Sequence, residues 1–182
     1  AGNGIRLAGG GDLLHQLAEK LQVPVVTCWD SIDLMANDNS YYCGRGGIMG
    51  DRAGNFAVQN SDLLICIGSR LNIYQVGYNV KTWARAAKTV VVDIDTEELK
   101  KPTVRVDIPV CADAKKFMER LLESSTEERC KQRNEWLSQY QQWKEKYPVV
   151  NEQQKSSKGL VNVYAFMDML MTLGFVFAAG KG

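Results

Sequence analysis

The sequence Leu-Leu-Ile-Cys-Ile-Gly-Ser-Arg at residues 63–70 decides the fold class. Its first part is a short, continuous apolar run, and a glycine, a serine and an arginine follow at once. Further runs of this kind, rich in β-branched residues, lie at residues 23–27 and 89–95. Strands that are buried on both faces of a parallel sheet are apolar without alternation. These runs are therefore predicted to be inner strands of one parallel sheet.

An edge strand and several helices complete the predicted sheet. Residues 104–110 alternate between apolar and polar, and Pro109 suits the edge because it has no N–H to donate. Helical patterns lie between the strands, at residues 12–21, 53–60, 81–87 and 113–123. Strands that alternate with helices predict a Rossmann-like, doubly wound α/β domain with a mainly parallel sheet. Residues 1–4 resemble the turn after a strand, so the first strand of the sheet is expected to be missing.

An aromatic stripe follows this domain. Residues 124–127 carry the Ser, Thr and Glu pattern of a helix start. On the helix that follows, aromatic side chains recur at spacings that place them on one face, namely Trp136, Tyr140, Trp143 and Tyr147. This stripe is predicted to pack on the same domain, or alternatively to contact another domain or subunit.

The last part of the sequence indicates a change of domain. Residues 151–159 are polar and indicate a linker, residues 160–173 follow a helical pattern, and residues 174–179 resemble the first strand of a new unit. The predicted organisation is an α/β domain at residues 1–123, a helix and linker at 124–159, and the start of a second α/β domain at 160–182.

Composition and charge exclude several classes of protein. Of the 182 residues, 45% are hydrophobic and 24% are charged, which excludes a disordered chain, a collagen-like repeat and a coiled coil. The 22 Lys and Arg residues against 21 Asp and Glu residues leave a net charge of +1 without a basic run, so no nucleic-acid partner is expected. No apolar stretch of about 18 residues and no signal peptide occurs, so we expect no membrane partner and a cytoplasmic location.

Cysteine and histidine indicate neither a metal site nor a nucleophile. Five cysteines occur without a Cys-x-x-Cys pair, and we expect all to be reduced and non-catalytic. They are Cys28, Cys43, Cys66, Cys111 and Cys130. The single histidine, His15, is expected on the surface of a helix. No catalytic and no metal-ligating residue is therefore assigned.

Several loops are expected at the carboxyl ends of the strands, where an open parallel sheet binds its ligands. The glycines in residues 2–6 and 44–50 could let the backbone approach a phosphate. Arg70 could pair with a phosphate or carboxylate, and Asp93 or Asp95 could accept a hydrogen bond from a ribose hydroxyl. The alternative is structural, with glycines that only turn the chain and aspartates that only cap the next helix.

Blocks of this sequence resemble, in the same order, the central domain of thiamine-diphosphate-dependent enzymes of the acetolactate synthase type. The blocks lie at residues 2–6, 18–27, 44–50, 55–64, 67–71 and 92–95. The resemblance covers residues 1–123, and residues 136–166 resemble the linker and opening helix of the next, diphosphate-binding domain.

The resemblance implies a three-domain parent enzyme that joins or decarboxylates 2-keto acids as a homodimer or homotetramer. Thiamine diphosphate and Mg²⁺ belong to the other domains of that parent, because the activating glutamate motif and the Gly-Asp-Gly…Asn motif do not occur in this chain. FAD or ADP is implied for the central domain, as in some members. The residues implied to bind it are Gly2, Asn3, Gly4, Gly50, Gly68, Ser69, Arg70, Asp93, Asp95 and Asp113.

Two features keep alternatives open. Residues 71–74 lack the acidic and basic residues that follow the arginine in acetolactate synthases, so the site could be empty or take another nucleotide. A non-catalytic nucleotide-binding or subunit-packing module is the alternative function. Residues 59–62 faintly resemble a signature of NAD-dependent protein deacylases, but this sequence lacks the paired cysteines that those enzymes need for zinc.

Overall fold

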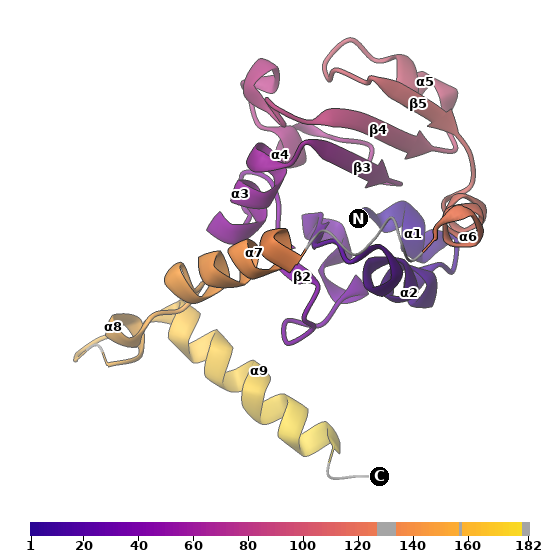
Figure 1. The fold of residues 1–182 in the computed structure, drawn as a ribbon. Coiled ribbons are helices and arrows are strands. Elements are labelled where there is room, and N and C mark those ends of the chain that lie inside the picture. Colours follow the sequence, from indigo (N-terminus) through magenta and orange to yellow (C-terminus); the bar gives the residue numbers. More distant parts are fainter. Residues whose placement is uncertain (127–133, 157, 180–182) are drawn as a thin grey trace. The chain divides into compact units, whose positions relative to one another are not determined.

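The strands of the computed structural model run parallel in two sheets (Figure 1). One sheet pairs β1 (Val25–Thr27) with β2 (Tyr42–Arg45), and the other has the order β3 (Leu63–Ile67), β4 (Lys88–Asp93) and β5 (Ile108–Cys111). The structure describes residues 1–126, 134–156 and 158–179, and side chains up to residue 171. The chain divides into two compact units, Ala1–Glu145 and Lys146–Gly182.

Helices alternate with these strands, which confirms the predicted Rossmann-like α/β class. In the first unit they are α1 (Asn3–Leu7), α2 (Gly11–Leu21), the 3₁₀ helix η1 (Trp29–Leu34), α3 (Arg52–Asn60), α4 (Ile73–Val76), the 3₁₀ helix η2 (Val80–Thr82), α5 (Thr96–Lys100) and α6 (Ala114–Ser124). After them come α7 (Asn134–Lys146), α8 (Glu152–Lys155) and α9 (Val163–Ala179).

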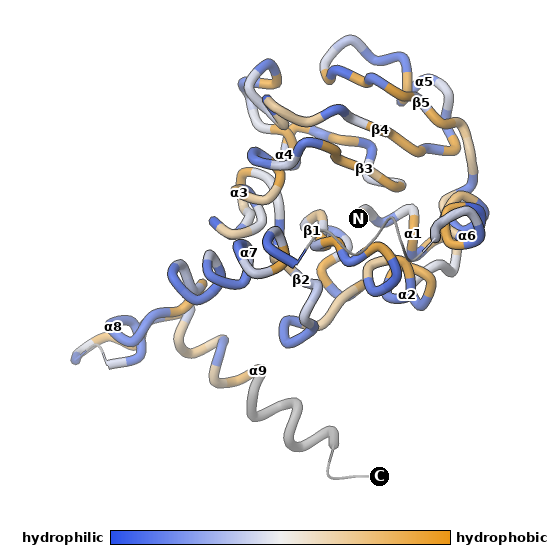
Figure 2. The backbone as a smooth tube through the Cα atoms, viewed as in Figure 1, coloured by the Kyte–Doolittle hydropathy of each residue, from blue (hydrophilic) through white to orange (hydrophobic). Residues whose placement is uncertain are grey.

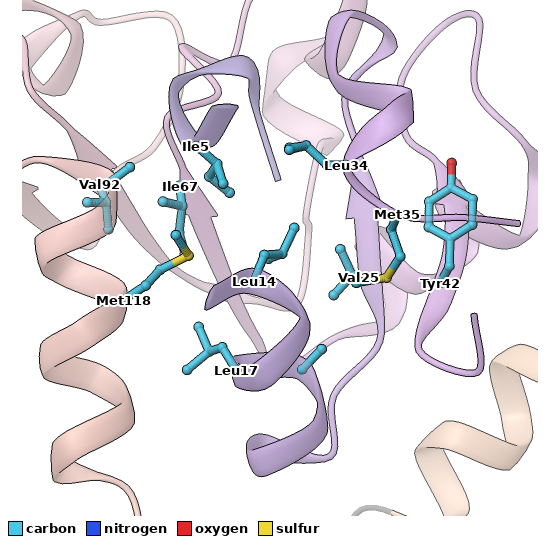
Figure 3. Packing of buried hydrophobic residues seen from close by; sticks show 12 residues of the cluster. Ile5, Leu14, Leu17, Val25, Leu34, Met35, Tyr42, Ile67, Val92 and Met118 are labelled. Atoms are coloured by element: carbon cyan, nitrogen blue, oxygen red, sulfur yellow. The ribbon is translucent and has the colours of Figure 1, made fainter. Parts of the chain in front are cut away.

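Both faces of β3 and β4 are apolar because each face contributes side chains to a hydrophobic cluster. Side chains alternate along a strand, so Ile67 joins a cluster with helices α1, α2 and α6 (Figure 3). Its neighbour Cys66 joins a cluster on the other face. Ile5 and Met118 are fully buried in the first cluster. Burial of such a side chain stabilises the fold by about 1.5–3 kcal/mol. The hydrophobic strands are visible in Figure 2.

Ala1 and Gly2 lie between the two sheets. The Ala1 nitrogen donates to the Val26 carbonyl at 2.6 Å, and the Cys28 N–H donates to the Ala1 carbonyl at 2.9 Å. On the other side, the Gly2 N–H donates to the Ile67 carbonyl at 3.0 Å. Hydrogen bonds to both neighbours are those of a parallel inner strand. The spatial order across the unit is therefore β2, β1, Ala1, β3, β4, β5.

Several local predictions are wrong. β2 was expected as part of a glycine-rich loop. Other parts of the chain cover and bury it, and the sequence of such a short strand does not reveal that burial. A helix was expected at residues 81–87, but η2 ends at Thr82 and Ala84 has a φ of 47°, which an α-helix does not permit. Residues 104–107 do not extend β5, because the Asp107 carboxylate bonds Thr89 there instead. The start of the chain is helical from Asn3 rather than a plain turn.

In the carboxyl-terminal part, one prediction lies partly outside the described residues and another is wrong. Ser124 ends α6, and its hydroxyl and that of Ser125 donate to the Leu121 carbonyl. The helix start expected at residues 124–127 stays a prediction. Glu127, the last residue of the expected cap, lies outside the described residues. Residues 174–179 are helical, since α9 continues to Ala179. A short apolar run has no period that distinguishes a strand from a buried helix.

The aromatic stripe packs on the first unit. Tyr140 is fully buried against Cys43 of β2 and Ala57 of α3, and Trp136 and Trp143 pack around the same cluster. These three aromatic side chains thus pack on the same domain, the first of the two predicted alternatives.

In the expected linker, residues 152–155 form the single turn α8, which Asn151 caps.

The Asp107 carboxylate predicts an acid-dependent loss of stability. It accepts hydrogen bonds from the Thr89 N–H at 2.7 Å and the Thr89 hydroxyl at 3.0 Å. The backbone hydrogen bond from Thr89 is the main cause that lowers the pKa of Asp107 below its ordinary value of 3.8. The contribution of these hydrogen bonds to the stability of the fold is complete above that ordinary value. It is lost as the pH falls through the lowered pKa of the folded state.

We therefore predict that Asp107→Ala lowers the urea midpoint of unfolding at pH 6. Between about pH 5 and about pH 2.5, the range in which carboxyl groups titrate, the midpoint of the variant falls less than that of the unchanged protein. Glu123→Ala, which removes an exposed carboxylate, is the control and keeps the full acid dependence. Equal acid dependence in both variants would contradict the prediction.

Candidate functional site

Two glycine-containing loops touch at the carboxyl end of β3. The Gly4 N–H donates to the Gly68 carbonyl at 2.9 Å. A Cβ atom on Gly2 would lie 2.3 Å from the Gly68 oxygen, and one on Gly4 would lie 2.7 Å from the Gly68 Cα. Gly68 itself has a φ of 56°, in the left-handed region. The contact between the two backbones therefore requires these glycines, whatever ligand the edge binds.

The residues that follow Gly68 are strained and partly unpaired. The Ser69 hydroxyl oxygen is buried and has no hydrogen-bond partner among the described residues. Arg70 and Leu71 have φ values of 52° and 42°, a conformation that costs about 1–2 kcal/mol per non-glycine residue. Burial of Leu71 and a hydrogen bond from Lys101 to the Arg70 carbonyl hold this turn. Strain that the surrounding packing maintains is a feature of binding sites.

The Arg70 side chain is exposed, and no ion pair with it occurs within the described ranges. Asn3, the first residue of α1, accepts a hydrogen bond from Arg6, which also pairs with Asp33. The charge of Arg6 is therefore neutralised, whereas that of Arg70 is available to an anion.

The predicted aspartates have structural partners. Asp93 is buried at the end of β4, and its Oδ1 accepts from the Asp95 N–H at 3.0 Å. Asp95 in turn caps α5 by accepting from the Glu97 N–H at 2.9 Å, and Asp113 caps α6 by accepting from the Lys116 N–H at 3.0 Å. The capping alternative thus describes Asp95 and Asp113, and Asp93 combines burial with a position next to the Gly68 loop.

Gly50 belongs to a second loop, at the end of β2. Asp51 pairs with the Arg45 guanidinium at 2.7 Å and accepts from the Arg45 N–H at 2.8 Å. These hydrogen bonds are the main cause that raises the pKa of Arg45. The Asn55 side chain bonds both the N–H and the carbonyl of Gly47. This loop is closed by its own contacts, so Arg45 offers no free charge to a ligand.

The sequence did not indicate that α4 contributes to this edge. The Gln75 side chain is 7% exposed, and its Oε1 has no hydrogen-bond partner in the described part of the chain. The Ile48 N–H donates to the Tyr74 carbonyl at 2.8 Å, and the rings of Tyr74 and Trp29 lie 5.9 Å apart, each residue 56% exposed. Asn72, which caps α4, is the local signal that could have revealed this helix.

Three of the cysteines are buried, and Cys111 is exposed. Burial raises the pKa of Cys43 and of Cys66 to about 12, and also raises that of Cys28, so these thiols are protonated at neutral pH. Cys130 lies outside the described residues. His15 is half-buried rather than on the surface, because its Nε2 lies 3.0 Å from the Leu34 carbonyl oxygen.

The described residues hold neither a metal-binding cluster nor a membrane-spanning helix. Within the described ranges, no group of three or more His, Cys, Asp or Glu side chains is arranged to hold a metal ion. No helix in this part of the chain combines the length and the apolarity needed to cross a membrane.

Comparison with known proteins identifies the family. Residues 1–121 match the family described as "Thiamine pyrophosphate enzyme, central domain". The chain belongs to this family. The predicted resemblance to the central domain of thiamine-diphosphate-dependent enzymes is thereby confirmed.

Relatives of this central domain are longer proteins. The chain is 32% identical over 171 residues to a probable acetolactate synthase large subunit of Methanocaldococcus jannaschii, covering 93% of the chain and 29% of the relative. It is 33% identical over 157 residues to the acetolactate synthase large subunit of Lactococcus lactis, covering 85% and 26%. It is 31% identical over 125 residues to a sulfoacetaldehyde acetyltransferase of Roseovarius nubinhibens, covering 66% and 20%. The chain thus spans less than a third of these relatives.

The family implies thiamine diphosphate as cofactor, but the residues of this chain do not fit it. Thiamine diphosphate is usually held together with Mg²⁺, which takes carboxylate and other oxygen ligands. Among the described residues no three or more His, Cys, Asp or Glu side chains converge on one point, and Asp95, Asp113 and Asp51 are engaged in helix caps or an ion pair. No reaction step is therefore assigned to residues of this chain.

The contact between the two glycine loops predicts a position-specific effect of alanine. We expect Gly2→Ala to lower the free energy of unfolding by about 1–3 kcal/mol, because its Cβ would overlap backbone atoms that cannot move aside. Gly11→Ala is the matched control, since a Cβ there meets no atom within 4 Å and alanine favours the helix by about 0.5–1 kcal/mol. Urea unfolding measures both, and equal effects would refute the role of the contact.

Proposed function

We propose that this chain is the central domain of an enzyme that joins or decarboxylates 2-keto acids with thiamine diphosphate and Mg²⁺, as acetolactate synthases do. The family match and the two acetolactate synthase relatives support this proposal. The cofactor and the metal would be held by other domains of the parent protein. That parent would act as a homodimer or homotetramer in the cytoplasm.

Within that enzyme, we propose that the carboxyl edge of the sheet binds a nucleotide diphosphate such as FAD or ADP. The observation that carries this proposal is the buried Ser69 hydroxyl without a described partner, next to the free charge of Arg70. Both follow β3 directly. A buried polar group without a partner is costly, so a ligand that bonds it would stabilise this loop.

The order of the strands supports the same position. From Ala1 the chain proceeds outward to β1 and β2, and then returns to the other side of Ala1 for β3, β4 and β5. The point at which the direction reverses lies between Ala1 and β3. Open α/β sheets bind their ligands at this topological switch point. Gly2 and Gly68 flank it.

The proposed roles differ among the implied residues. The backbone of residues 2–4 and 68–69 would lie against the diphosphate, and Arg70 would pair with its charge. Asp93 would accept a hydrogen bond from a ribose hydroxyl, as acids at strand ends do. Asp95, Asp113 and Gly50 would hold the surrounding loops, because their observed contacts are internal.

A non-catalytic packing module is the second candidate function. The exposed rings of Trp29 and Tyr74 beside the same edge favour it, because exposed aromatic pairs of this kind are enriched where proteins associate. In that case a subunit or domain would cover this edge, and no nucleotide would bind.

Calorimetric titration with FAD, ADP and NAD separates the two candidates. We predict that one of these nucleotides binds and that Arg70→Ala weakens its Kd about tenfold or more, the loss expected for one charged hydrogen bond. Arg85→Ala is the matched control, because Arg85 bonds Asn60, which precedes β3 at the opposite end of the sheet. Absence of heat with all three nucleotides, or equal effects of the two arginine variants, would count against the nucleotide site.

Because the cofactor and the metal are proposed to be held by other domains, we expect catalytic activity only in the parent protein. The parent protein, supplied with thiamine diphosphate and Mg²⁺, is expected to release CO₂ from a 2-keto acid, whereas the 182-residue chain alone shows no turnover above the uncatalysed rate. Coupled measurement of CO₂ release tests both. Turnover by the isolated chain, or an inactive but folded parent, would contradict the proposed enzyme.

A further inference from the structure

A lysine from a distant part of the chain holds one peptide group of the strained turn after β3. The carbonyl between Arg70 and Leu71 accepts a hydrogen bond from the Lys101 ammonium. The orientation of this planar group depends on ψ of Arg70 and on φ of Leu71. Both residues have a positive φ, 52° and 42°, although neither is a glycine. The lysine therefore fixes the peptide group at the point where the backbone conformation is intrinsically unfavourable.

Leu71 provides the second anchor of this turn. Its side chain is 4% exposed and belongs to the cluster to which Cys66 of β3 and Val91 of β4 contribute. Leu99 of α5 packs against the same cluster. Burial of Leu71 thus holds the end of the turn that enters the core, whereas Arg70 is exposed and is held at its carbonyl by Lys101.

Lys101 is itself fixed, because it follows directly on the short helix α5. Its ammonium pairs with Glu98 at 2.7 Å, and the two side chains are 24% and 26% exposed. At the start of α5, Asp95 accepts from the Glu97 N–H at 2.9 Å and donates its own N–H to Asp93 at 3.0 Å. One short helix therefore connects Asp93, at the end of β4, to the turn after β3.

The contacts of Lys101 favour an indirect role in binding an anion. An ammonium has three N–H donors, and those of Lys101 serve the Glu98 carboxylate and the Arg70 carbonyl. The carboxylate also neutralises the lysine charge. Among the ion pairs of the described residues, none includes Arg70. The charge that an anion would meet is therefore that of Arg70, and Lys101 determines where its backbone lies.

We propose that Lys101 is a positioning residue for the nucleotide site, which fixes the Arg70–Leu71 peptide group and thereby presents the Arg70 guanidinium to the diphosphate. Through α5, the same contact keeps Arg70 in a fixed relation to Asp93, the residue proposed to bind the ribose. A loop that is already in its binding conformation does not lose affinity to molecules in other conformations. This inference rests on the proposed function.

Calorimetric titration with FAD, ADP and NAD tests this role in a double-mutant cycle. We expect Lys101→Met to weaken the Kd of each nucleotide that binds about fivefold, because only about a fifth of the molecules would then hold the turn in its binding conformation. In the Arg70→Ala background, the same substitution is expected to change the Kd less than about twofold. Lys101→Arg keeps a donor for the carbonyl and a charge for Glu98, and it is expected to restore the affinity.

Lys100→Met is the matched control. Lys100 forms the same kind of pair with a glutamate three residues earlier, Glu97, at 3.0 Å, and this hydrogen bond stays within α5. The control is expected to leave the Kd unchanged.

A second measurement needs no ligand. By NMR relaxation of the 182-residue chain, the order parameter of the Leu71 amide, which belongs to the peptide group held by Lys101, is expected to fall from about 0.85 to below about 0.6 in Lys101→Met. It is expected to stay high in Lys100→Met. Unchanged order parameters in β4 show that each variant is folded.

Several results would overturn the proposal. Equal Kd values for the two lysine variants, or a Leu71 order parameter that does not respond to Lys101→Met, would refute the role of Lys101. An equally large effect of Lys101→Met with and without Arg70 would mean that the lysine contacts the ligand directly. If the unchanged protein binds none of the three nucleotides, the nucleotide site fails and this inference fails with it, whereas binding that ignores Lys101→Met contradicts this inference alone.

Discussion

The backbone contact between Gly4 and Gly68 is the constraint on which the first unit depends. Because neither residue has a side chain, the start of α1 can lie directly on the end of β3, where the Gly4 N–H bonds the Gly68 carbonyl. That position buries Ile5 completely and allows its carbonyl to accept from the Gly10 N–H. The chain then turns into α2, which packs with α6 over the sheet. The contact thus determines both the core and the geometry of the proposed site.

Few polar groups at the carboxyl edge of the sheet are available to a ligand. Most polar groups there already serve the fold, since Asp95 and Asp113 cap helices and Asp51 holds Arg45. The Ser69 hydroxyl and the Arg70 charge are different, because they have no such partner among the described residues. They also lie in the strained turn that Leu71 anchors. A site with so few polar groups that lack a structural partner is better suited to ligand binding than to catalysis.

The predictions succeeded where hydrophobic pattern and burial coincide. The run Leu63–Ile67 and the amphipathic helices α2 and α6 lie close to their expected positions, because each buries a continuous apolar surface. They failed where distant residues decide the conformation. β2 is a strand because it pairs with β1 and is covered by Tyr140 from α7, almost a hundred residues away as counted from the printed positions. The expected aspartates of the site proved to cap helices, which their position alone could not distinguish from binding.

By itself, the sequence determined the α/β class, the parallel order of short apolar strands and the family, because these follow from local composition and from ordered motifs. The tertiary structure decided which glycines touch, which charges are neutralised and where the sheet is open. These features depend on the distances between segments such as Gly2 and Gly68, which lie far apart in the chain. Hydrophobic burial specifies each element over a few residues, whereas the pairing of their backbone groups is settled when the elements meet.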